Sequence, residues 1–504
     1  MLTEIYSAVV YGIDAKLVRV EIDINNGLPG MDMVGLLSNE VKEARERVKI
    51  AIKNSEFEFP NKKITINLSP ANLRKNGTQY DLAIALGILK NIGVIGAVDL
   101  RGICALGELN FNGGINPVNG VLSSVIQAKK SGIKKVIVPE KNYKEASLIK
   151  EIEIVPVSSL AKAVLYLNGA YALTVPEEND DGKVVSEKLD FSEVKGQFMA
   201  KRAAEICAAG MHNLLLAGPP GAGKSMISRR IPTIMPELTY EEQIELTRIY
   251  SVAGKLNDGG LVTERPFRDP HHSISRGALI GGGNHPVPGE ITFANNGILF
   301  MDEFPEFKRD TIEVLRQPLE EGRIVINRLY GSIVYPARFT LVAAMNRCPC
   351  GYFPDRSKCN CMPNEINRYL SKISQPLLDR IDLKVDMPAI KFDEFDENIK
   401  SESSEVMRRR VARARNMQDR RYKNLGVKYN SRLDSKQTEE FCQISVESKN
   451  RIRKLFNEHE FSARSYYRIL KTSRTIADLD GSERILDKHV NEALMFRITN
   501  LKEE

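Results

Sequence analysis

The segment from Gly218 to Ser225 has the glycine, lysine and hydroxyl spacing of a phosphate-binding loop. It fits the pattern G-x-x-x-x-G-K-[ST] in full, and it lies between the apolar run NLLLA and the helical run MISRRIP. Glycines let backbone N–H groups curl around phosphates, and the start of the following helix adds partial positive charge. We therefore predict an ATP site that contains Gly218, Pro219, Pro220, Gly221, Ala222, Gly223, Lys224 and Ser225.

Four polar residues at this site have separate expected roles. Lys224 should reach the β- and γ-phosphates of ATP, and the Ser225 hydroxyl should ligate Mg²⁺. The apolar strand GILFMDE ends in Asp302 and Glu303, and unpaired carboxylates are costly beside a buried strand unless a metal balances them. Asp302 is predicted to hold Mg²⁺ through water, and Glu303 to orient and activate the attacking water.

A third apolar strand, FTLVAAMN, ends in Asn346. A polar amide at a strand tip beside Glu303 could position the same water, and the alternative is an asparagine that only forms the turn. Strands that alternate with helices imply a parallel sheet with ligand chemistry at the strand carboxyl ends. The three strand ends are therefore expected to meet at one edge of the sheet.

Four of the seven cysteines are clustered in the pattern C-x-C-x₈-C-x-C. Two such pairs on one loop can bind one tetrahedral Zn²⁺, and four sulfur ligands leave no open position for catalysis. The alternative is a loop with four free thiols. We predict one structural zinc bound by Cys348, Cys350, Cys359 and Cys361.

These candidates lie in the central part of a chain of 504 residues, which is long enough for about three domains. Residues 1–170 alternate short strand-like runs with helical runs and predict an α/β domain. Residues 171–190 are polar and acidic and predict a linker. Residues 191–388 are the expected ATPase core with the cysteine loop, and residues 389–504, which are helical and strongly charged, are the expected helical lid.

The net charge of +7 permits nucleic-acid binding without demonstrating it. The basic residues concentrate in MRRRVARARNMQDRRYK, where Arg408 to Lys423 include one acid, Asp419. This segment is a candidate DNA contact, and a solvated helix face is the alternative. No apolar run approaches about 18 residues, so we expect no membrane partner. The first residues resemble a strand and not a signal peptide, so a cytoplasmic protein is expected.

Four segments carry a resemblance to a known family: PFRDPHHSIS, GALIGGGNHPVPGEITFANNGILFMDEFPEF, AAMNRCPCGYF and PLLDRIDL. Together they resemble the magnesium-chelatase-like AAA+ ATPases of the YifB/ComM type, over essentially the full length. The resemblance implies a homo-oligomeric ring, expected to be a hexamer, in which each ATP site is completed by the neighbouring subunit.

The same resemblance implies two further site residues. Arg380 resembles the arginine finger that reaches the next subunit's γ-phosphate, and the alternative is an ion pair with Asp379 or Asp382. Arg464 resembles the lid arginine that bends onto the nucleotide, with Arg468 as the competing choice.

The N-terminal domain resembles the proteolytic domain of Lon proteases, which implies a ribosomal S5 domain 2-like fold. The Lon serine motif is matched here by the segment from Gly77 to Asp81, in which Gln79 replaces the serine, and the Lon lysine falls at Leu122. Without a nucleophile and its base there is no acyl transfer, so no proteolysis is expected. Thr78 could replace the serine in principle, but no lysine stands at the matching position.

Three functions remain open at this point. The first is an ATP-driven ring motor on DNA, in helicase or branch-migration reactions of recombination or natural transformation. The second is a protein-remodelling ATPase whose N-terminal domain binds substrate. The third is the motor subunit of a metal chelatase. His271 and His272 are expected in a structured loop near the pore or the ATP site, without an assigned role.

Overall fold

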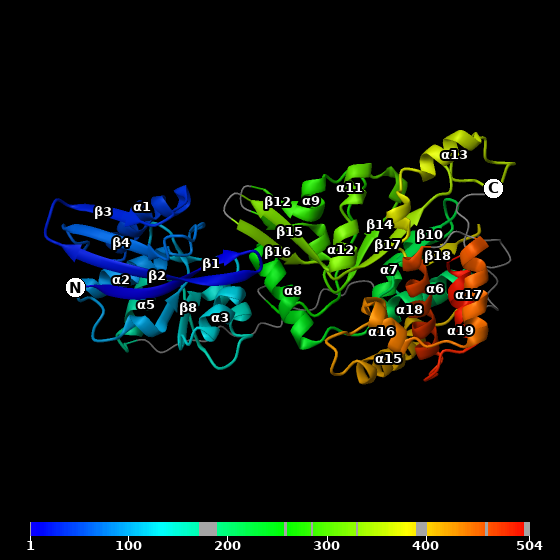
Figure 1. The fold of residues 1–504 in the computed structure, drawn as a ribbon. Helices are drawn as coiled ribbons and strands as arrows, with labels where there is room; N and C mark the ends of the chain where they lie inside the picture. The colour runs from blue at the N-terminus through cyan, green and yellow to red at the C-terminus, as the bar shows by residue number, and fades with distance from the viewer. Residues whose placement is uncertain are drawn as a thin grey trace.

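The computed structural model describes residues 2–170, 189–256, 260–283, 286–328, 331–389, 401–458 and 462–497. Three regions follow one another across the molecule in Figure 1: an N-terminal α/β region in blue and cyan, a central α/β region mainly in green, and C-terminal helices in orange and red. This arrangement confirms the predicted α/β class with a parallel sheet and a helical C-terminal region. Residues 171–188, most of the predicted linker, lie outside the described residues.

The N-terminal region contains a seven-stranded mixed sheet of order β3-β4-β2-β1-β5-β8-β9. One apolar cluster joins the sheet to α1, α2 and α5, and a second joins it to α3 and α4, so helices cover both faces. The elements are β1 (Thr3–Tyr11), β2 (Asp14–Asn25), β3 (Gly30–Val34), α1 (Asn39–Asn54), β4 (Lys63–Ser69), α2 (Asp81–Asn91), β5 (Ile103–Ala105), β6 (Glu108–Leu109), β7 (Ile115–Asn116), α3 (Val121–Lys130), β8 (Lys135–Pro139), α4 (Tyr143–Ala146), β9 (Glu153–Val157) and α5 (Leu160–Leu167).

The central region is built on a five-stranded parallel sheet of order β11-β14-β17-β10-β18. Every residue of β10, β14 and β17 is buried, which explains their uninterrupted apolar sequences. Because the strands are parallel, their carboxyl ends meet at one edge. The strands are β10 (Leu214–Ala217), β11 (Phe267–Arg268), β14 (Ile298–Met301), β17 (Thr340–Met345) and β18 (Leu383–Asp386).

Helices and two hairpins surround this sheet. The hairpins are β12 (Gly281–Gly282) with β13 (Val287–Pro288), and β15 (Arg323–Arg328) with β16 (Gly331–Pro336). The helices are α6 (Phe198–Gly210), α7 (Lys224–Ile234), α8 (Tyr240–Val252), α9 (Arg276–Ile280), α10 (Glu290–Phe293), α11 (Arg309–Glu313), α12 (Arg316–Glu321), α13 (Pro363–Leu370) and α14 (Gln375–Leu378).

The C-terminal helices share one apolar cluster with α6 and α7, so they pack directly on the central region. Ile231 of α7, Val411 of α15 and Ile476 of α18 belong to this cluster. Among the described helices, none is both long and apolar enough to cross a membrane. The C-terminal helices are α15 (Ser404–Arg421), α16 (Ser435–Phe441), α17 (Val446–Glu458), α18 (Ala463–Leu479) and α19 (Asp487–Met495).

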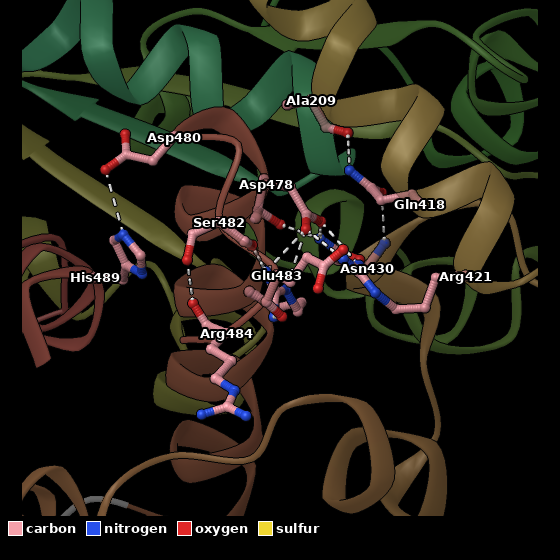
Figure 2. A network of polar contacts seen from close by, with 12 residues as sticks. Ala209, Gln418, Arg421, Asn430, Asp478, Asp480, Ser482, Glu483, Arg484 and His489 are labelled. Carbon is pink, nitrogen blue, oxygen red and sulfur yellow. Dashed lines mark hydrogen bonds and ion pairs between the residues drawn. The ribbon is translucent and has the colours of Figure 1, made fainter. Parts of the chain in front are cut away.

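A buried carboxylate, Asp478, fixes α15 against α18 (Figure 2). Its two oxygens accept hydrogen bonds from Arg421 at 2.6 and 3.0 Å, and Asn430 donates to it at 2.9 Å. Gln418, one turn before Arg421, donates to the carbonyl of Ala209 in α6 at 3.0 Å. A buried charge is stable only when it is paired and hydrogen-bonded, and these contacts meet that condition.

The N-terminal region is joined to the central region through the turn between β1 and β2. Ile13 packs against two apolar clusters of the central region. A Cβ added to Gly12, whose φ is +70°, would stand 3.0 Å from Ile333 of the β15–β16 hairpin. Arg248 of α8 donates to the carbonyl of Ile13 at 3.0 Å, and the N–H of Gly120 donates to the carbonyl of Ser251 at 3.2 Å. The turn therefore touches both a hairpin and a helix of the central region.

Candidate functional site

The predicted phosphate-binding loop connects β10 to α7 at the carboxyl edge of the parallel sheet. Gly221 and Gly223 have φ values of +78° and +87°, and a Cβ added to either would meet nothing within 4 Å. Positive φ at glycine turns successive N–H groups inward, which is the geometry of an anion-binding loop. The loop is therefore shaped to accept phosphate and has open space in front of it.

Lys224 lies at the start of α7 with its ammonium group turned back over the loop. Its Nζ donates to the carbonyls of Gly218 and Pro219 at 2.7 and 2.9 Å, and to Oδ1 of Asn346 at 3.0 Å. Burial lowers the pKa of Lys224 from its ordinary value, and the charge of Asp302 partly opposes this. Asn346, predicted to act on water, thus contacts the lysine directly.

A hydroxyl and a carboxylate meet beside this lysine. The Ser225 hydroxyl donates to Oδ2 of Asp302 at 2.7 Å, which brings the start of α7 and the end of β14 together. Hard oxygen donors of these two kinds are what Mg²⁺ requires, together with water and phosphate oxygens. The pair fits a magnesium ion at the predicted position.

Glu303 follows Asp302 in an unusual backbone conformation. Its φ and ψ are +51° and +44°, a left-handed region that costs a non-glycine residue about 1–2 kcal/mol. Strain of this kind concentrates at functional sites. The carboxylate is half exposed and lies 3.3 Å from Nδ1 of His272. His272 is therefore at the ATP site, and the sequence had left this position open between the pore and that site.

Asp269, in the same loop as His272, is a third carboxylate at this site, and sequence reasoning had not assigned it. Arg229 of α7 pairs with it at 3.0 Å. Burial and, to a smaller extent, the charge of Asp302 raise the pKa of Asp269, while Arg229 opposes the change. The influence of Asp302 indicates that the two carboxylates lie close enough to interact electrostatically.

The four clustered cysteines converge as predicted. Their Sγ atoms all lie within 4.8 Å of one another, with Cys348 at 3.3 Å from Cys350 and at 3.7 Å from Cys359. Tetrahedral sulfur ligands 2.3 Å from zinc are about 3.8 Å apart, so the cluster fits that ion. The N–H of Phe353 also donates to Sγ of Cys348 at 3.3 Å, as expected around a thiolate.

The cysteine loop also touches the phosphate-binding loop. A Cβ added to Gly351, whose φ is +89°, would stand 2.7 Å from the ring of Pro220 and 3.6 Å from the amide of Asn346. Arg347, between Asn346 and Cys348, forms an ion pair with Asp386 at the end of β18. The cysteine loop therefore packs against one side of the nucleotide site.

The two arginines implied by the family resemblance lie together, away from these residues. Arg380 is 5% exposed and its Nη2 lies 2.6 Å from Oε1 of Glu320. Arg464 is 59% exposed and reaches the same oxygen at 3.3 Å. Within the described part of the chain, neither arginine hydrogen-bonds or ion-pairs with the phosphate-binding loop, Asp302 or Glu303.

This arrangement differs from one sequence expectation: the ion-pair partner of Arg380 is Glu320, and not Asp379 or Asp382. Arg464 lies beside Arg380 and pairs with the same carboxylate. Arg468, the competing choice, is already paired with the buried Asp382.

Three of the eight basic residues in the predicted segment make contacts inside the protein. Arg410 pairs with Glu205 and Glu402, Arg415 lies 3.9 Å from the centre of the Tyr429 ring, and Arg421 binds Asp478. The exposed basic residues of this segment are Arg408, Arg409, Arg413, Arg420 and Lys423. Arg410, Arg415 and Arg421 fit neither interpretation, and the choice between a DNA contact and a solvated face now concerns the exposed residues of α15.

The positions that match the Lon dyad hold neither a nucleophile nor its base. The Gln79 side chain donates to the carbonyls of Ala8 and Asn76 at 3.2 and 3.0 Å, and Leu122 is fully buried. The Thr78 hydroxyl donates to Glu108. Thr78, Gln79 and Glu108 border a cavity of about 870 Å³. Its lining also includes Val252, Val287 and Ile333 of the central region.

Known proteins are similar to this chain over nearly its full length. Family models for magnesium chelatase subunit ChlI match residues 20–142 and 190–395, and the model for its C-terminal part matches residues 401–497. Competence protein ComM of Haemophilus influenzae is 41% identical over 502 residues, which cover 98% of this chain and 97% of that protein. The uncharacterized protein YifB of Escherichia coli is 42% identical over 499 residues, with the same coverage.

Similarity to Lon proteases is confined to part of the chain. Lon protease 2 of Bacillus subtilis is 25% identical over 202 residues, which cover 35% of this chain and 36% of the protease. The similarity over the full length is to ComM and YifB, and it includes the phosphate-binding loop, the strand-end acids and the C-terminal helices. The chain belongs to the YifB/ComM family of magnesium-chelatase-like AAA+ proteins.

Proposed function

We propose that the protein is an ATP-hydrolysing ring motor, a hexamer acting on DNA in the cytoplasm, in helicase or branch-migration reactions of recombination or natural transformation. The observation that carries the DNA assignment is the exposed row Arg409, Arg413 and Arg420, which recurs at helical spacing along one face of α15. The name of the Haemophilus relative, a competence protein, is consistent with this role.

The residues of the site divide into binding and hydrolytic groups under this proposal. Lys224 and the loop bind the phosphates of ATP, and Ser225 and Asp302 bind Mg²⁺. Glu303 activates the attacking water, and Asn346 positions both Lys224 and that water. Arg380 and Arg464 act on the nucleotide of the adjacent subunit, because within the described residues they do not approach their own.

The experiment that tests the function is ATP hydrolysis with and without single-stranded, duplex and forked DNA at about 50 mM salt, where phosphate contacts are strong. We expect DNA to bind and to raise the rate. A protein-remodelling motor is the second candidate, favoured by the 870 Å³ cavity that both regions line. If DNA neither binds nor stimulates, that candidate replaces the DNA motor.

Replacing Arg409, Arg413 and Arg420 by glutamate should weaken DNA binding while basal hydrolysis stays unchanged. Each lost phosphate contact should reduce the slope of log affinity against log salt by about 0.9, as measured by titration at several salt concentrations. The matched control is Lys42, Lys49 and Lys53 replaced by glutamate, since these residues form an exposed row of similar spacing on α1. Equal losses in the two triple variants would show that net charge, and not α15, controls affinity.

The cysteine cluster should bind one zinc per chain in chelator-washed, tag-free protein. Cys348→Ser or Cys361→Ser should lose that zinc, because three thiolates and a hydroxyl bind it more weakly than four thiolates. Both variants should also bind nucleotide more weakly, since Gly351 rests on Pro220. Metal analysis is the measurement, with Cys104→Ala, buried in the N-terminal region, as the control. Wild-type protein without zinc would refute the site.

A further inference from the structure

Glu320, the penultimate residue of α12, lies between two arginines that come from distant parts of the chain. The same oxygen, Oε1, is 2.6 Å from Arg380 and 3.3 Å from Arg464. Two guanidinium groups this close to one atom repel each other unless a negative charge separates them. The carboxylate therefore decides whether the two arginines can remain side by side.

The charge of Glu320 is secure at neutral pH. Burial opposes its ionisation, but the hydrogen bond from Arg380 and the charges of Arg380, Arg464 and Arg468 outweigh burial and hold its pKa below the ordinary value. The carboxylate is 39% exposed, so one side of it still faces solvent. The cluster thus has a net positive charge and an open side.

Arg380 is not fully satisfied inside this cluster. Nη1 donates to the carbonyl of Pro376 at 2.6 Å and Nη2 binds Glu320, but Nε is buried and has no partner among the described residues. Buried polar groups normally have a hydrogen-bond partner, so this unpaired donor is an exception that calls for an explanation.

We propose that Glu320 is a positioning residue that aligns Arg380 and Arg464 as one two-armed clamp for the triphosphate bound by the neighbouring subunit. The inference rests on the proposed ring, in which these arginines act across the subunit interface. Arg464 is a long, exposed side chain that would otherwise sample many rotamers, and an ion pair with a fixed carboxylate limits them before the phosphate arrives. The expected effect is on the rate of the chemical step and not on ATP binding, since the phosphate-binding loop belongs to the other chain.

The test uses mixed rings in which one interface type is active. Arg380→Ala subunits supply the intact loop, and Lys224→Ala subunits supply the intact arginines, so hydrolysis in the mixture reports the interface between them. Adding Glu320→Gln to the Lys224→Ala subunit should lower kcat of the mixture about tenfold and leave KM for ATP unchanged. The matched control is Glu321→Gln on the same subunit, because Glu321 is 41% exposed on the same helix and pairs with Arg323 instead.

Each outcome has one interpretation. An unchanged or increased kcat with Glu320→Gln would overturn the proposal. An equal fall when Glu320→Gln is placed on the Arg380→Ala subunit would indicate a structural defect and would also overturn it. Partial recovery with Glu320→Asp would support a charge-dependent positioning role. If the mixture of Arg380→Ala and Lys224→Ala subunits, with Glu320 intact, shows no hydrolysis, the arginines do not act across the interface. That result would refute the proposed ring mechanism and, with it, this inference.

Discussion

Glu303→Gln should bind ATP normally and hydrolyse it about 10²–10⁴-fold more slowly, the range typical for loss of a general base. The amide keeps the size of the side chain but cannot accept the proton of the attacking water. Lys224→Ala should instead lose nucleotide binding, since its ammonium group lies at the mouth of the loop against Gly218 and Pro219. Single-turnover hydrolysis and binding of a fluorescent nucleotide separate the two effects.

The control for Glu303→Gln is Glu306→Gln, in the same short turn. Glu306 is half exposed and pairs with Lys372 at 3.3 Å, away from the magnesium ligands, so its loss should leave hydrolysis near the wild-type rate. Hydrolysis close to the wild-type rate in Glu303→Gln would remove this residue from the mechanism and would point to Asp269, the other carboxylate near Asp302.

Arg380→Ala should bind ATP and lose about 10³–10⁵ of the hydrolysis rate, which is the contribution of an arginine finger to phosphoryl transfer. The guanidinium group offsets charge that develops on the transferred phosphoryl group, and here it would do so from the adjacent subunit. Mixing with Lys224→Ala subunits should restore part of the rate. The measurement is steady-state hydrolysis as a function of the mixing ratio.

Arg323→Ala is a suitable control, because Arg323 is exposed and its ion pair is with Glu321, two residues away, at 3.2 Å. A mixture that shows no more activity than the sum of its two components would mean that Arg380 acts within its own chain or has a structural role. Its low exposure and its ion pair with Glu320 would then be the whole explanation of its environment.

The spacing of apolar residues along the sequence was sufficient to predict individual helices and strands. The segment from Ser38 to Ser55 predicts a helix, because Val41, Ala44 and Val48 recur at helical spacing; the structure has this helix as α1, with those three residues buried. The strands that end in Asp302 and Asn346 are likewise confirmed, since buried parallel strands read as continuous apolar runs.

Contacts between distant segments could not be predicted in the same way. Sequence reasoning found Arg380 and Arg464 by resemblance but missed Glu320, since nothing near it in sequence marks it as their common partner. His272 reaches Glu303 only because β11 and β14 are adjacent in the sheet. The arginines of α15 divide into buried and exposed sets because Glu205 and Asp478, on α6 and α18, lie on one side of that helix.

The turn between β1 and β2 has a consequence for how the chain can be divided. Ile13 covers apolar side chains of the central region, and Gly12 lies against Ile333 with space for little more than a hydrogen atom. Cutting the chain after residue 170 would uncover this surface and remove the carbonyl that Arg248 binds. A fragment lacking the first 170 residues would thus carry a newly exposed apolar surface and be prone to aggregate.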